Sequence, residues 1–210
     1  MKNLIFDIDG TLWDSTGVVA KGWNKAAGES DILSVKNMVI TKEMLMKEFG
    51  KPMDVIADDL FGDIDPAKKA DILKKCCVYE HEALVENTKD LAFEGMRETM
   101  RELSKNHRLF IVSNCQDGYI ELVMEKNGLT DIIEDFECFG HTGLQKDENI
   151  LLVIERNKLD PKDTVYIGDT YGDYTATKKA GLPFAFCTFG FGEVSEPDFV
   201  INKFTDLLEF

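Results

Sequence analysis

The chain has 210 residues, a length that suggests one domain, or a core with an inserted module. Of these residues 44% are hydrophobic and 30% are charged, which is ordinary for a globular protein. Its formal net charge of −15 at pH 7 disfavours binding to nucleic acid or to an anionic membrane surface. No segment approaches the length of an apolar membrane span.

The first predicted element is a short buried strand at residues 4–6, followed by Asp7, Asp9 and Gly10. Three consecutive large apolar residues are typical of a strand that is buried on both faces of a parallel sheet. The two carboxylates are one strand repeat apart, so both side chains are expected on the same side where the strand ends. Such a pair requires a divalent cation, a shared proton or diverging side chains, unless both are ordinary turn residues.

Residues 14–87 show helical periodicity and almost no strand signal. Helices are predicted around residues 18–27, over 41–49 and 53–61, and from 65 toward 85. Asp65 and Pro66 stand in the order expected of a helix cap and a first-turn proline. The apolar faces of these helices predict a small helical bundle.

From about Thr88 onward, strands alternate with helices. Strands are predicted at 108–112, 136–139, 164–167, 184–187 and 199–201, and helices at 94–106, 117–127, 147–157, 172–180 and 205–210. This alternation implies a parallel sheet wrapped by helices on both faces. We therefore predict an α/β fold, in which residues 1–13 and 88–210 form a Rossmann-like catalytic core and residues 14–87 form an inserted all-helical cap domain.

Three further polar clusters lie near the ends of predicted strands. Ser113 and Asn114 follow the second strand, Lys146 directly precedes the helix predicted at 147–157, and Asp169 and Asp173 bracket the turn after another strand. Each cluster alone has an ordinary explanation, namely a helix cap, a solvated lysine, and turn and cap chemistry.

Together with Asp7 and Asp9, these clusters fall at one end of a single predicted sheet, where open α/β sheets bind ligands. Carboxylates and water are the ligands that Mg²⁺ prefers. A lysine, a hydroxyl and backbone N–H groups are what phosphate oxygens prefer.

The five cysteines are scattered, apart from the adjacent Cys76 and Cys77, and no pair has the Cys-x-x-Cys spacing. This pattern indicates no disulfide framework, and with only three histidines a zinc site is not expected. The first residues also lack the apolar run and cleavage site of a signal peptide. We therefore expect a cytoplasmic protein.

Taken in chain order, the polar clusters resemble the four motifs of the haloacid dehalogenase (HAD) superfamily. The matching segments are Phe6-Asp7-Ile8-Asp9-Gly10-Thr11-Leu12, Val112-Ser113-Asn114, Lys146, and Ile167-Gly168-Asp169-Thr170 through Asp173. The resemblance covers essentially the whole chain, because the helical insert resembles the family's C1-type cap. Within the superfamily, the chain is most similar to the phosphoglycolate phosphatase-like hydrolases.

The resemblance implies roles for the carboxylates. Asp7 would be the nucleophile that forms an aspartyl-phosphate, and Asp9 would be the general acid and then the general base. Mg²⁺ would be held by Asp7, by the backbone carbonyl of Asp9 and by Asp169.

The resemblance also implies a phosphate site. Ser113, the backbone N–H of Asn114 and Lys146 would bind the phosphate oxygens. Asp173 would orient Lys146 and, with Thr11, support the metal site from behind its direct ligands.

The expected function is a Mg²⁺-dependent phosphatase of small phosphorylated metabolites, such as phosphoglycolate or sugar phosphates. Asp9 favours phosphoryl transfer over dehalogenation, because a halide leaves without a proton. A phosphomutase and a pyrophosphatase of the same superfamily are the alternatives, and a non-catalytic phosphate-binding or regulatory protein is the alternative from another class. The expected partner is a small phosphorylated molecule, with no nucleic acid and no membrane, and the sequence does not predict an oligomeric state.

Overall fold

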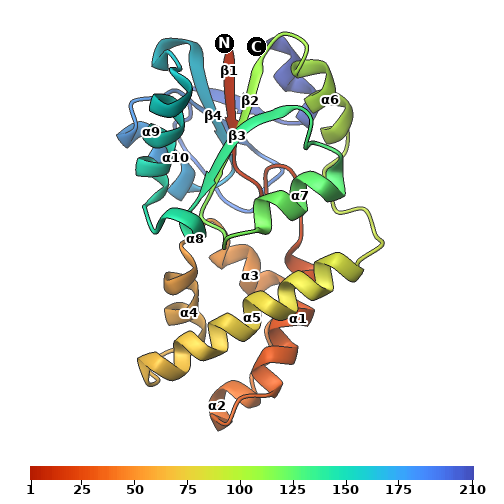
Figure 1. Cartoon of the computed structure of the whole chain (residues 1–210), viewed down its shortest axis with the longest axis vertical. Helices are drawn as coiled ribbons and strands as arrows, with labels where there is room; N and C mark the ends of the chain where they lie inside the picture. Colours follow the sequence, from red (N-terminus) through yellow and green to blue (C-terminus); the bar gives the residue numbers. More distant parts are fainter. The chain divides into compact units, whose positions relative to one another are not determined.

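The computed structural model describes residues 1–210 and contains two compact units (Figure 1). The first unit comprises Met1–Asp14 and Ala92–Phe210, and the second comprises Ser15–Leu91. None of the helices combines the length and the apolar character that crossing a membrane would require.

The first unit is built on one sheet of six parallel strands in the order β3-β2-β1-β4-β5-β6. The strands are β1 Asn3–Phe6, β2 Arg108–Ser113, β3 Ile133–Cys138, β4 Thr164–Gly168, β5 Phe184–Cys187 and β6 Phe199–Ile201. The predicted α/β fold with a parallel sheet is therefore confirmed.

The central position of β1 explains why the polar clusters share one edge of the sheet. Phe6 at the end of β1 is in register with Ile111 of β2 on one side and with Ile167 of β4 on the other. The residues that follow these three positions therefore lie at nearly the same level, and the three strands end close together at one edge of the sheet. Asp7, which comes directly after β1, donates its backbone N–H to the carbonyl of Ile167 at 2.9 Å.

Helices cover both faces of this sheet (Figure 1). They are α6 Met96–Leu103, α7 Tyr119–Asn127, α8 Phe139–Thr142, α9 Lys146–Asn157 and α10 Tyr171–Lys179, with short 3₁₀ helices η1 Pro161–Asp163 and η2 Phe204–Glu209. Ile5 faces a buried cluster that includes Ile150 of α9 and Ala176 of α10. The next residue, Phe6, stacks on Phe204 of η2 with ring centroids 6.3 Å apart, because successive strand residues point to opposite faces.

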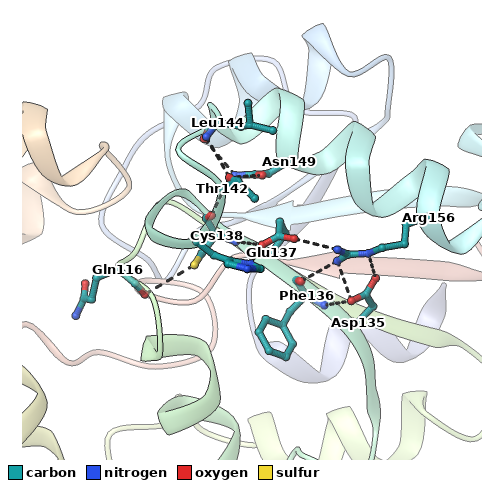
Figure 2. Close-up of polar contacts among 10 residues, drawn as sticks. Gln116, Asp135, Phe136, Glu137, Cys138, Thr142, Leu144, Asn149 and Arg156 are labelled. Carbon is teal, nitrogen blue, oxygen red and sulfur yellow. Dashed lines mark hydrogen bonds and ion pairs between the residues drawn. The ribbon is translucent and has the colours of Figure 1, made fainter.

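The third strand begins earlier than predicted, at Ile133 rather than at residue 136. Acidic residues interrupt its apolar pattern, so the sequence hides the first residues of the strand. Figure 2 shows how these charges are compensated by Arg156 of α9. Its guanidinium binds both carboxylate oxygens of Asp135, at 2.7 and 2.8 Å, and Oε2 of Glu137 at 3.0 Å. A planar guanidinium suits this two-point binding.

The C-terminal segment also differs from the prediction. It is a 3₁₀ helix at Phe204–Glu209 rather than an α-helix over 205–210. Asp206 accepts hydrogen bonds from the backbone N–H groups of Asn202 and Lys203, at 3.0 and 3.1 Å. Such a short segment has few i to i+4 bonds to lose, so the tighter turn is accessible.

The second unit is all-helical. Its helices are α1 Thr16–Gly28, α2 Leu33–Lys36, α3 Lys42–Glu48, α4 Met53–Phe61 and α5 Pro66–Glu86. Helices α1 and α5 approach closely at Gly22, where a Cβ would lie 2.6 Å from the carbonyl oxygen of Tyr79. The neighbouring Trp23 is fully buried, stacks on Phe61 and donates its indole N–H to the buried carboxylate of Glu80 at 2.6 Å. A buried polar pair of this kind is tolerated because both groups are hydrogen-bonded.

Candidate active site

The candidate site is centred on Asp7, which is only 1% exposed. Lys146, 3% exposed, donates from Nζ to Asp7 Oδ1 at 3.0 Å and to Asp173 Oδ1 at 2.5 Å. The hydroxyl of Ser113, at the end of β2, also hydrogen-bonds to Asp7. The buried Asn114 follows Ser113. The structure therefore brings groups from all four predicted polar clusters to one edge of the sheet.

The buried cluster contains more carboxylates than cationic groups. Burial raises the pKa of Asp7 to about 6, although Lys146 acts to lower it. Burial also raises the pKa of Asp169 well above its usual range, and the negative charges of Asp173 and Asp7 add to the shift. Burial lowers the pKa of Lys146, but the carboxylates of Asp173 and Asp7 outweigh this effect, so its pKa is raised. One lysine therefore faces three buried carboxylates, and a further cation would relieve their repulsion.

The carboxylate geometry fits such a cation. One oxygen each from Asp7, Asp169 and Asp173 can be chosen so that all lie within 4.8 Å of one another. Oxygen-only donors of this kind suit Mg²⁺. Asp173 already uses Oδ1 for Lys146 and Oδ2 for the hydroxyl of Thr170, at 2.7 Å. These bonds favour a role for Asp173 in orienting its neighbours over direct coordination.

Asp169 lies in a tight cradle. Its Oδ1 accepts from the hydroxyl of Thr11 at 3.2 Å, and its Oδ2 accepts from the backbone N–H of Phe191 at 2.7 Å. A Cβ at Gly10, where φ is +86°, would lie 2.1 Å from Asp169 Oδ2, and one at Gly190 would lie 2.2 Å from Asp169 Cβ. Gly190 and Phe191 are not among the site residues predicted from the sequence, although the glycines after β5 were a usable signal.

Gly190→Ala is expected to weaken Mg²⁺ binding by about tenfold or more, because the new methyl group would push Asp169 out of position. The measurement is the increase in melting temperature across a Mg²⁺ titration, since a ligand stabilises only the state that binds it. Gly28→Ala is the matched control, because a Cβ there meets no atom within 4 Å. A Mg²⁺ response of Gly190→Ala equal to that of wild type would contradict the prediction.

Lys146 is positioned by the turn that leads into α9. The helix begins at Lys146 itself, one residue before the predicted start. In Figure 2, Thr142, Leu144 and Asn149 bind one another around this turn. The Thr142 hydroxyl donates to Asn149 Oδ1 at 2.8 Å, and Asn149 Nδ2 donates to the carbonyl of Leu144 at 3.1 Å. These bonds hold the start of α9 in place, and with it the lysine.

Asp9 lies beside this cluster rather than within it, and its side chain is partly exposed. The hydroxyl of Tyr119 donates to Asp9 Oδ1 at 2.9 Å. Tyr119 is not among the site residues predicted from the sequence, because it lies in none of the motifs and is 110 residues away from Asp9 along the chain. Trp13 is buried and packs edge-on against the Tyr119 ring, with centroids 6.0 Å apart.

Comparison with known proteins agrees with this architecture. The phosphoglycolate phosphatase of Salmonella typhimurium (strain LT2) is 29% identical in an alignment of 241 positions, which covers 99% of this chain and 91% of that protein. The crystal structure of a predicted phosphoglycolate phosphatase from Haemophilus somnus superposes with a TM-score of 0.83 at 20% identity, covering 100% of this chain and 97% of the other. That of a β-phosphoglucomutase from Clostridium difficile gives 0.78 at 16% identity, covering 99% and 93%. The family model for haloacid dehalogenase-like hydrolases matches residues 4–187. The chain therefore belongs to the haloacid dehalogenase-like hydrolase family.

Proposed function

We propose that this protein is a Mg²⁺-dependent phosphatase of small phosphorylated metabolites that acts through an aspartyl-phosphate on Asp7. The observation that carries the proposal is the buried Asp7 carboxylate, held 3.0 Å from Lys146 Nζ in a cluster with Asp169, with the partly exposed Asp9 beside it. A pure phosphate-binding protein has no use for a second carboxylic acid at this place. The 29% identity with a phosphoglycolate phosphatase supports the same choice.

In the first half-reaction, a carboxylate oxygen of Asp7 attacks phosphorus and the bond to the leaving oxygen breaks. Asp9, in its protonated form, gives its proton to that leaving oxygen. In the second half-reaction, the Asp9 carboxylate takes a proton from the water that attacks the aspartyl-phosphate. Inorganic phosphate is released and Asp7 is regenerated.

The remaining residues would bind the phosphoryl group and the metal ion. Ser113, the backbone N–H of Asn114 and Lys146 would bind the phosphoryl oxygens as negative charge shifts during transfer. Asp7, Asp169 and the backbone carbonyl of Asp9 would hold Mg²⁺, which supplies the positive charge that lets an anionic nucleophile approach an anionic ester.

Two further residues would orient the groups that bind the phosphoryl group and the metal ion. Asp173 orients Lys146 through its bond of 2.5 Å, and Thr11 holds Asp169 through its bond of 3.2 Å. The helical unit at residues 15–91 would serve as the cap that selects the substrate and excludes bulk water during the reaction.

The test is phosphate release from 4-nitrophenyl phosphate by the purified chain, with Mg²⁺ and with EDTA. We expect turnover with Mg²⁺, its loss with EDTA and its recovery when Mg²⁺ is restored. Turnover that EDTA does not change would contradict the metal assignment, and binding of inorganic phosphate without any turnover would favour the non-catalytic alternative.

A substrate panel then separates the enzymatic alternatives. Phosphoglycolate, hexose phosphates and pyrophosphate are tested for free phosphate, and the hexose phosphates also for isomerisation. A phosphomutase would isomerise a hexose phosphate and release little phosphate, whereas a pyrophosphatase would prefer pyrophosphate.

A further inference from the structure

The carboxylate proposed as the general acid is bound by a tyrosine that lies in none of the four motifs. Tyr119 is the first residue of α7, and its hydroxyl donates to Asp9 Oδ1 at 2.9 Å. The tyrosine is 2% exposed, whereas Asp9 is partly exposed. A buried donor held by packing keeps its acceptor in one orientation, which exchanging water molecules would not do.

The position of the Tyr119 ring is fixed by its surroundings. Gly118 has a φ of 80°, so the chain can turn sharply into α7 at this point. The Trp13 ring meets the Tyr119 ring edge-on, with an interplanar angle of 67°. The carbonyl of Trp13 accepts the backbone N–H of Gly10 at 2.9 Å, which closes the turn that carries Asp9. Trp13 therefore contacts the ring of the donor, Tyr119, and also closes the turn that carries the acceptor, Asp9.

We propose that Tyr119 is a positioning residue, whose hydroxyl holds Asp9 Oδ1 so that Oδ2 is turned toward the leaving oxygen of the ester. This inference rests on the proposed phosphatase function. During ester cleavage, the proton moves from Asp9 Oδ2 to the leaving oxygen as the Asp7–phosphorus bond forms. During hydrolysis of the aspartyl-phosphate, Asp9 Oδ2 takes a proton from water. In both steps Tyr119 keeps its own proton and acts only through Asp9.

The test is Tyr119→Phe, which keeps the ring and removes only the hydroxyl, assayed with Mg²⁺ on two aryl phosphates. The leaving group of 4-nitrophenyl phosphate is stable as an anion, whereas that of phenyl phosphate is more basic and depends more on the acid. The value of kcat/KM reports ester cleavage. We expect it to fall about tenfold on phenyl phosphate and less than about threefold on 4-nitrophenyl phosphate.

Tyr166→Phe is the matched control. The Tyr166 hydroxyl is also buried, but it donates to the carbonyl of Val112 at 2.7 Å instead of to Asp9. The control variant is expected to leave the ratio of the two kcat/KM values unchanged. Thermal unfolding of both variants measures the cost in stability separately.

A second comparison uses the Asp9→Asn background. Because Tyr119 acts through Asp9, adding Tyr119→Phe to Asp9→Asn is expected to change kcat/KM on phenyl phosphate by less than about twofold. Equal losses of Tyr119→Phe on both esters, or a loss on phenyl phosphate that persists in full in the Asp9→Asn background, would overturn the inference while the proposed function stands. A wild type that releases no phosphate from either ester would overturn the proposed function and this inference with it.

Discussion

Replacing Asp7 with asparagine is expected to reduce phosphate release by about 10⁴-fold or more, because an amide cannot attack phosphorus in place of the carboxylate. The measurement is release from 4-nitrophenyl phosphate with saturating Mg²⁺. Asp63→Asn, on the exposed surface of the helical unit, is the control and is expected to retain activity. Residual turnover of Asp7→Asn within about tenfold of wild type would exclude the aspartyl-phosphate mechanism.

The Asp7→Asn substitution is also expected to leave the fold intact and to change how the stability of the folded protein depends on pH. Burial raises the folded-state pKa of Asp7 to about 6, so the protonated carboxyl is favoured in the folded protein. A raised pKa contributes stability that is present below the unfolded-state pKa and is lost as pH rises through the folded-state pKa. The metal-free wild type should therefore lose stability from about pH 4 to about pH 6, and Asp7→Asn should lose less.

Urea unfolding in EDTA across this pH range measures the difference, again with Asp63→Asn as the control. Two parallel stability curves for wild type and Asp7→Asn would show that the buried Asp7 carboxyl does not titrate in this range.

Lys146→Met is expected to lower turnover by about 10²- to 10³-fold, because it removes a preorganised cation from the phosphoryl site. It also leaves Asp7 and Asp173 buried without their lysine, and breaking such a pair costs about 3–5 kcal/mol of unfolding free energy. The raised pKa of Lys146 means that its contribution is present at neutral pH and is lost only as pH rises through that pKa.

The loss of stability in Lys146→Met should shrink as pH falls, because protonation of Asp7, whose pKa is raised by burial, removes one of the charges that the lysine compensated. The measurement is urea unfolding of the metal-free variant across pH, with the exposed Lys162→Met as the control. Adding Asp173→Asn to Lys146→Met should recover part of the stability but none of the activity. A Lys146→Met variant as stable as wild type at neutral pH would contradict this account of the cluster.

Much of the candidate site could be predicted from local patterns alone. The apolar residues 4–6 indicate a buried strand, and the polar residues after it must leave the sheet at its carboxyl end. The same argument places Ser113 and Asp169 at that edge, and the register of β1 with β2 and β4 brings them level. Alternating apolar strands and amphipathic helices were therefore sufficient for the α/β fold, because each of these signals lies within a few residues along the chain.

The tertiary structure alone decided what surrounds these groups. The start of β3 was missed because Glu134 and Asp135 break its apolar pattern, and only the packing of α9 brings Arg156 to the charges of Asp135 and Glu137. The contact of Tyr119 with Asp9 joins residues 110 positions apart, and no local pattern encodes which distant side chain fills that place. Strand ends are set by short-range sterics and hydrophobicity, whereas the partners of a buried carboxylate are set by how whole elements pack.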